Sequence, residues 1–156
     1  MTELSIHSDE HYMRLALQQA QLSFENSEIP VGAVIIANHK VIAKAHNQVQ
    51  QLNDVTAHAE MVAITSAQNH LGAKYLDQCT LYVTLEPCTM CAGALYWSQI
   101  GRIVIAAKDE KRGYQRLEPS VLHPKTEVSY GVLEDAASGL LSDFFTQMRL
   151  KTKRKN

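Results

Sequence analysis

Thr84-Leu85-Glu86-Pro87-Cys88-Thr89-Met90-Cys91 is the stretch that decides how this chain folds and what it can hold. It begins at the end of an apolar, β-branched run and turns at a proline into a helix-like pattern. Two cysteines separated by two residues at such a helix start can turn both sulfurs to one side, as metal ligands. Unpaired backbone amides and the positive end of the helix dipole favour the thiolate, which is the ligating form.

The cysteine pair alone leaves three interpretations open: a redox motif, half of a structural zinc site, or part of a catalytic metal site. The segment His58-Ala59-Glu60, at the start of a second helical pattern, bears on this choice. His58 with Cys88 and Cys91 makes three protein ligands, the number that leaves the fourth tetrahedral position of zinc for water. Residues two apart on a helix do not share a face, so we expect Glu60 to have a role separate from ligation.

Together the two motifs resemble the zinc-dependent nucleoside deaminases, whose signature is H-x-E followed by P-C-x-x-C. The similarity is greatest to the bacterial tRNA adenosine deaminases, in segments 29–34, 56–60, 81–88 and 90–94. The resemblance implies a three-layer α/β/α cytidine-deaminase-like fold, with a mixed five-stranded sheet flanked by helices. It also implies that residues 1–156 form a single CMP/dCMP-type deaminase domain.

The resemblance further implies hydrolytic deamination of adenosine to inosine at the wobble position of a tRNA anticodon. One Zn²⁺ per subunit, with a bound water or hydroxide, is the implied cofactor, and a homodimer that binds the anticodon stem-loop is the implied assembly. The implied site residues are the metal ligands His58, Cys88 and Cys91, the catalytic Glu60, and the substrate contacts Asn47, Ala59, Pro87 and Asp109.

Three other functions remain as alternatives. A deaminase of a free base or nucleoside, such as guanine or cytosine, would use the same zinc chemistry. A non-enzymatic nucleic-acid-binding module with a structural zinc would need a fourth ligand, for which Cys79 and His46 are the candidates, and it would have no use for Glu60. A redox C-x-x-C protein would cycle its thiols without zinc.

The loop after the apolar run 102–107 departs from the family pattern. Where relatives carry small residues, this chain has Tyr114-Gln115-Arg116-Leu117-Glu118-Pro119, which bears on substrate preference. The resemblance places Asp109 of this loop against the anticodon strand. We expect Arg112, Tyr114 and Arg116 to add phosphate and stacking contacts.

Composition sets the outer limits. The chain has 156 residues, of which 46% are hydrophobic and 20% charged, enough for one domain with a buried core. Its net charge of −1 excludes a strongly basic nucleic-acid binder, although residues 151–156 form a basic tail. Three cysteines exclude a disulfide framework. Neither an export signal in 1–7 nor a membrane-spanning run is present in the sequence, so we expect a cytoplasmic protein.

Hydrophobic periodicity predicts alternating helices and strands, and hence an α/β layered domain. We expect a helix capped by Ser8, a hairpin turning at Asn38-His39, and a helix that is capped from within 53–56 and stops at Gly72. We also expect strands at 81–85, 102–107 and 127–130. The helix after the cysteines has small residues at 92–94 that allow close backbone approach, with Leu95 and Trp97 supplying bulk, and it is expected to form either a tight contact within the chain or a dimer interface, which the resemblance favours. The last helix is expected over 134–148, with inward residues Leu140, Leu141, Phe144, Phe145 and Met148 and a frayed tail.

Overall fold

The protein is built on one five-stranded sheet, seen in a computed structural model that describes residues 6–156. The strands are β1 (Gly32–Ala37), β2 (Lys40–His46), β3 (Cys79–Leu85), β4 (Arg102–Ala107) and β5 (Glu127–Tyr130). The helices are α2 (Asp9–Glu25), α3 (Val49–Leu52), α4 (Ala59–Leu71), α5 (Thr89–Ser98), α6 (Glu134–Lys155) and the short 3-10 turn η1 (Tyr114–Arg116). The expectation for the N-terminal segment falls mostly on residues 1–5, outside the described residues.

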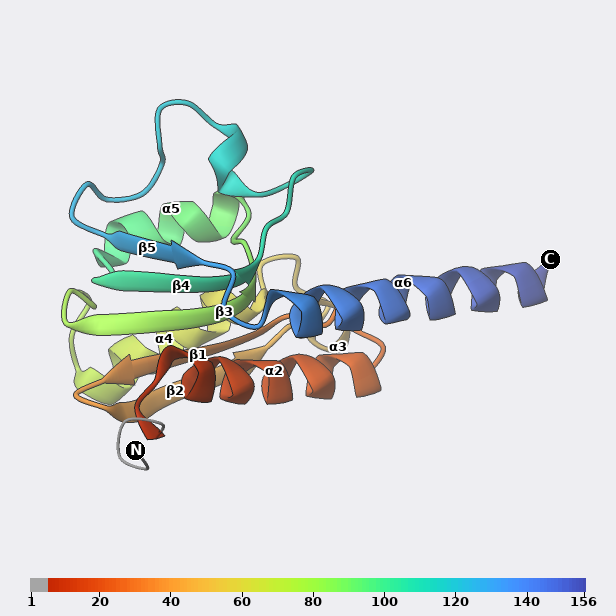
Figure 1. Cartoon of the computed structure of the whole chain (residues 1–156), viewed down its shortest axis with the longest axis horizontal. Coiled ribbons are helices and arrows are strands. Elements are labelled where there is room, and N and C mark those ends of the chain that lie inside the picture. The colour runs from red at the N-terminus through yellow and green to blue at the C-terminus, as the bar shows by residue number, and fades with distance from the viewer. Residues whose placement is uncertain (1–5) are drawn as a thin grey trace.

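The sheet is mixed, as predicted, with strand order β2-β1-β3-β4-β5. β1 pairs antiparallel with β2 and β3, whereas β4 lies parallel to both β3 and β5. The parallel strands therefore bring their carboxyl ends to the same edge, and α5 and the long loop between β4 and β5 start there (Figure 1). Such an edge is where open α/β sheets bind ligands.

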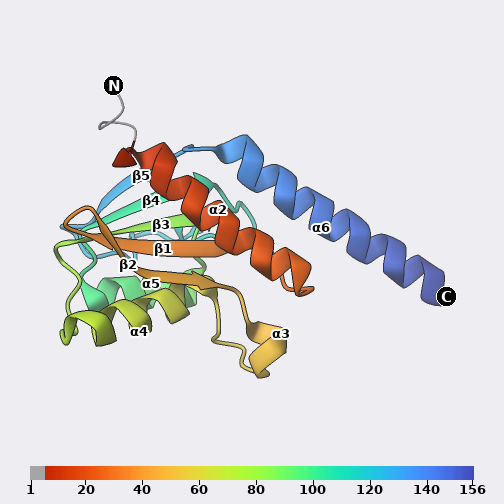
Figure 2. The same ribbon diagram turned by 90° about the horizontal axis from the view of Figure 1, so that it is seen from below.

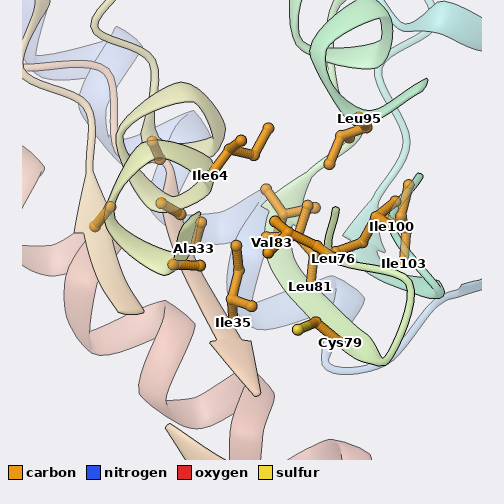
Figure 3. Close-up of a cluster of buried hydrophobic side chains, with 14 of the residues drawn as sticks. Ala33, Ile35, Ile64, Leu76, Cys79, Leu81, Val83, Leu95, Ile100 and Ile103 are labelled. Carbon is orange, nitrogen blue, oxygen red and sulfur yellow. The ribbon is translucent and has the colours of Figure 1, made fainter. Parts of the chain in front are cut away.

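Helices cover both faces of the sheet, so the three-layer arrangement is confirmed. α4 and α5 lie on one face, and α2 and the first part of α6 lie on the other (Figure 2). Under α4 and α5, the core contains fully buried aliphatic side chains from the sheet and both helices, including Ile35, Leu81, Val83 and Leu95 (Figure 3). A second cluster under α2 includes Met13, Val34 and Val104.

The first helix and the hairpin follow their sequence signals closely. The Ser8 side chain accepts a hydrogen bond from the backbone N–H of His11, which caps α2. Met13 and Ala20 of its apolar stripe are completely buried. The hairpin turns at Asn38 and His39, whose φ angles of 54° and 61° are both left-handed, as the tightest hairpin turns require.

Segment 53–56 does not cap α4 as predicted. The chain first forms the four-residue helix α3, and Asp54 then accepts hydrogen bonds from the N–H and hydroxyl of Thr56, within the loop. α4 begins instead at His58 as its N-cap and ends, as predicted, at a left-handed Gly72. The Asp54 side chain therefore forms hydrogen bonds within the loop and does not cap a helix, and His58 occupies the N-cap position of α4.

The prediction for the last helix was wrong in length and was only partly right about its inward residues, since Leu140 and Leu141 are half-buried. α6 continues to Lys155, and only Phe144 of the five expected inward residues is buried. Phe145 and Met148 are 43% and 41% exposed. The reason is geometric, since the second half of α6 runs past the edge of the sheet with nothing beneath it (Figures 1 and 2).

On α5, Leu95 is completely buried whereas Trp97 is 77% exposed, so Trp97 is not packed in the core and its place in a dimer interface stays a prediction. The two residues lie on opposite sides of a helix that packs on the sheet through one face only. Among residues 6–156, no helix is both long and apolar enough to cross a membrane.

Candidate metal centre

Two helix starts meet at the carboxyl end of β3, and each has a metal-ligating residue at its N-cap. His58 is the N-cap of α4, and Cys88 is the N-cap of α5, with Cys91 in the first turn of α5. Neither N-cap side chain makes a capping hydrogen bond. The two side chains point toward each other, with His58 Nδ1 and Cys88 Sγ 3.6 Å apart, and do not act as ordinary helix caps.

The three donor atoms have the separations that a tetrahedral zinc ion requires. His58 Nδ1 lies 3.6 Å from Cys88 Sγ and 3.5 Å from Cys91 Sγ, and all three atoms lie within 4.8 Å of one another. Zinc bonds of about 2.0–2.1 Å to nitrogen and about 2.3 Å to sulfur, at the tetrahedral angle, put nitrogen and sulfur about 3.6 Å apart. The donor set fits zinc in both chemistry and spacing.

A closed four-ligand site is not found among residues 6–156, because the group of metal donors contains His58, Cys88 and Cys91 alone. The two candidates for a fourth ligand lie elsewhere. Cys79 is buried at the other end of β3, and the His46 ring is hydrogen-bonded to Gln19. The structural-zinc alternative therefore lacks the ligand it needs in the described part of the chain.

Without a metal, the three donors share protons among themselves. The Cys91 thiol donates to Cys88 and, with His58, lowers the pKa of Cys88 to about 4. The same bond raises the pKa of Cys91, and the hydrogen bond with Cys88 raises the pKa of His58. Metal binding requires the deprotonated forms, so it releases protons and weakens as the pH falls.

Glu60 lies beside this group without joining it. It is the second residue of α4 and only 4% exposed, and burial raises the pKa of its carboxyl group. Its side chain is hydrogen-bonded with Cys91. A buried carboxyl group of raised pKa next to a metal site has the properties of a group that takes up and gives back protons during a reaction.

Asn47, predicted as a substrate contact, is hydrogen-bonded within the protein through both ends of its side-chain amide. Its Oδ1 accepts from the backbone N–H of Ala59 at 2.8 Å, and its Nδ2 donates to the carbonyl of Ile29 at 3.0 Å. The side chain thus ties the end of β2 to the first residue of α4. It holds the position of the residue that lies between His58 and Glu60.

The loop 108–116 lies against the metal-binding turn. The N–H of Tyr114 donates to the carbonyl of Pro87 at 3.0 Å, and Asp109 Oδ1 accepts from the amides of Lys111 and Arg112. Tyr114 is only 4% exposed, so the prediction that its ring stacks on substrate was wrong. Its hydroxyl instead bonds to that of Tyr130 on β5.

Glu86 is a site residue that sequence reasoning missed. It is 4% exposed, and its carboxylate accepts from the backbone N–H groups of Asp109 and Gln115. The available signal was a carboxylate between a buried strand and a proline, where no solvent would be expected to reach it.

Comparison with known proteins identifies the family to which a chain with this donor group belongs. A family model described as the cytidine and deoxycytidylate deaminase zinc-binding region matches residues 6–107. The chain belongs to this deaminase family. A tRNA-specific adenosine deaminase of Aquifex aeolicus (strain VF5) is 45% identical over 145 residues, which cover 90% of the present deaminase and 95% of that relative.

The chain is also similar to solved structures of deaminases. One, from a study of A-to-I editing by tRNA:A34 deaminases at the wobble position, is 40% identical with a TM-score of 0.79, over 84% of this deaminase and 99% of that chain. Another, a guanine deaminase from Bacillus subtilis, is 42% identical with a TM-score of 0.61, over 64% of each chain. The cofactor of the deaminase is zinc, and the His58, Cys88 and Cys91 group is positioned to bind one ion.

Proposed function

We propose that this deaminase converts adenosine to inosine at the wobble position of a tRNA anticodon. The observation that carries the proposal is the three-donor group with a buried, non-ligating Glu60 beside it. That arrangement suits hydrolytic deamination, and the resemblance to tRNA adenosine deaminases in two comparisons supports the substrate.

In the proposed mechanism, His58, Cys88 and Cys91 hold the zinc ion. When bound, zinc lowers the pKa of a water molecule in its open position toward neutrality and so supplies the nucleophile. A Glu60 carboxylate oxygen accepts the proton of this water and passes it to the adenine ring nitrogen. Glu60 then takes up the second proton of the former water, from the new hydroxyl group on the ring carbon, and gives it to the amino group. The C–N bond breaks, ammonia leaves, and the water oxygen remains on the ring carbon as the carbonyl oxygen of inosine.

The proposed substrate contacts surround this centre. Ala59 directly precedes Glu60, and its backbone N–H is hydrogen-bonded to the Asn47 side chain. Pro87 directly precedes Cys88. Asp109 belongs to the loop that packs on the Pro87 turn. We assign these four residues to the wall that orients the base, with Asp109 on the side of the anticodon strand.

We also propose that residues 1–156 form one deaminase domain that acts as a homodimer in the cytoplasm, where its tRNA substrate is found. The exposed aromatic pair Tyr96 and Trp97 on α5, in edge contact with each other, supports a protein interface on that helix. Light scattering on the purified protein will give the mass of a dimer if this assignment is right, and the mass of one chain if it is wrong.

The function is tested by incubating unmodified tRNA with the zinc-loaded protein and sequencing the product. Inosine is read as guanosine, so we expect an A-to-G change at the wobble position and nowhere else. The Glu60→Gln variant is the matched control, because it keeps the donor set and removes the proton carrier. An unchanged anticodon after exposure to active, zinc-loaded protein contradicts the proposal.

Free guanine is the second candidate substrate, because the chain also resembles a guanine deaminase structure at 42% identity. An ammonia assay with free guanine, cytosine and adenosine distinguishes the two functions. Ammonia from guanine, together with an unchanged tRNA, would reverse the assignment.

A further inference from the structure

We propose that Glu86 is a positioning residue that fixes the substrate-facing loop 108–116 against the metal-binding turn. As far as substrate is concerned, the inference rests on the proposed function. Glu86 belongs to neither the donor group nor the proton path. It acts on the loop through backbone hydrogen bonds.

The Glu86 carboxylate holds the loop near both of its ends. It accepts from the N–H of Asp109 at 3.3 Å and from the N–H of Gln115 at 3.2 Å, one bond to each oxygen. The side chain is only 4% exposed, so water cannot substitute for these donors. A buried carboxylate without such donors is strongly unfavourable, and the loop and the carboxylate therefore stabilise each other.

The backbone of the loop approaches Glu86 so closely that only glycine fits there. A Cβ on Gly113 would lie 1.7 Å from Glu86 Oε2 and 2.5 Å from the carbonyl oxygen of Asp109. Gly113 also makes a backbone bridge to Cys88, next to the hydrogen bond from Tyr114 to Pro87. The loop is thus joined to the turn that contains a proposed metal ligand.

A second anchor fixes the far end of the loop to β5. The hydroxyl groups of Tyr114 and Tyr130 are 2.5 Å apart, and the side-chain amide of Gln115 also bonds to Tyr130. Tyr114 and Gln115 are adjacent, so they attach one short stretch of the loop to β5. Between these attachments, Arg112 is exposed to solvent, while Asp109 is partly buried.

Releasing Glu86 should therefore free the loop while leaving the metal donors in place, because Cys88 and Cys91 are held by α5. Loss of loop order weakens binding of the RNA before the chemical step. It leaves the proton transfer by Glu60 unchanged. The expected signature is a rise in KM at nearly constant kcat.

The test variant is Glu86→Gln, which keeps the shape but places an NH₂ group where one amide needs an acceptor. With an anticodon stem-loop RNA, we expect KM to rise at least about tenfold, which is the effect of losing one hydrogen bond to a charged group. We expect kcat and zinc content to stay within about twofold of the parent. Trypsin should cut the variant faster after Lys111 and Arg112, since these sites lie in the freed loop.

Two further variants keep the test decisive. Gly113→Ala should reproduce the KM and trypsin effects, because its Cβ displaces the same carboxylate. Asp9→Asn is the control for removing a paired carboxylate elsewhere in the fold, since Asp9 is paired with Arg102 at the opposite end of β4, and it should change neither KM nor cutting in the loop.

Unchanged trypsin cutting in both Glu86→Gln and Gly113→Ala overturns the inference. A fall in kcat or zinc content at unchanged KM also overturns it, because a merely structural role predicts that pattern. If the parent protein does not act on RNA, the proposed function fails separately. The trypsin comparison then decides by itself whether Glu86 holds the loop.

Discussion

The start of α2 and the starts of α4 and α5 use the same helix position for opposite purposes. At α2, Ser8 caps the backbone, and Asp9 and Glu10 follow in the first turn. At α4, the N-cap His58 makes no capping hydrogen bond with its side chain, and Asn47 accepts from the first N–H of the helix instead. At α5, the N-cap is Cys88, a residue type that is not among the preferred caps. The first arrangement stabilises a helix, and the second aims the donors at one point.

The contrast shows that two helix starts have metal-ligating residues at the N-cap position, where a better capping residue would stabilise the helix. A serine or aspartate in place of His58 would offer an acceptor to the second or third N–H of α4, in addition to the first N–H that Asn47 already accepts from. The metal site can exist only because those positions hold poor caps. Each prediction below breaks or sharpens this difference, from the largest expected effect to the smallest.

Removing a donor should abolish both the metal and the reaction. Cys88→Ala or Cys91→Ala leaves two donors of the three that lie within 4.8 Å of one another. We expect zinc content near zero after dialysis and deamination at background level, measured by metal analysis and an inosine assay. Full zinc occupancy in either variant would remove that cysteine from the donor set.

Glu60→Gln should separate metal binding from turnover. The carboxyl group is buried beside the donors but is not one of them, so zinc should remain at one per chain. Turnover should fall by about a hundredfold to ten-thousandfold, the usual contribution of a positioned proton carrier. A variant with unchanged turnover would exclude Glu60 from the mechanism.

His58→Ser tests the comparison directly, because it places a good cap at a donor position. The N-cap backbone already has the extended conformation that capping serines adopt, with φ −70° and ψ 151°. We expect the metal-free chain to gain about 1 kcal/mol in free energy of unfolding while losing zinc binding. Urea unfolding in EDTA measures the gain, and a loss of stability would show that His58 packing outweighs capping.

Ser8→Ala should have the reverse profile. It removes the side-chain oxygen that accepts from the His11 amide, and we expect a loss of about 1 kcal/mol in unfolding free energy. Zinc content and turnover should match those of the parent, since α2 lies on the other face of the sheet (Figure 2). Altered zinc content in this variant would contradict the separation of the two kinds of helix start.

Asp9→Asn should have the smallest effect, and one that depends on pH. The hydrogen bond from Arg102 lowers the pKa of Asp9, so the pair stabilises the fold above the unfolded pKa of about 3.9. That contribution is lost as the pH falls through the lower folded-state pKa. We expect a loss of under about 1 kcal/mol at pH 7, since solvent screens the half-buried pair, and a progressively smaller loss as the pH falls through the folded-state pKa of Asp9. A loss that stays the same as the pH is lowered would contradict an ionic origin.

The prediction from sequence succeeded where one local pattern carried the information. Strand β4 was predicted with the bounds it has, and Gly72 ends α4 as expected, because periodicity and a left-handed cap are local properties. It failed where the outcome depended on distant elements. Met148 lies on an apolar stripe, but the sheet ends before α6 does, so nothing covers that side chain.

The sequence by itself determined the donor types, their spacing on two helix starts, and hence the family and the zinc chemistry. Only the tertiary structure brought His58 to within 3.6 Å of sulfur atoms some thirty positions away, and only it gave Glu86 a role. The physical reason is that ligand chemistry is a property of single residues. Burial and hydrogen-bond partners depend on which segments the sheet places side by side.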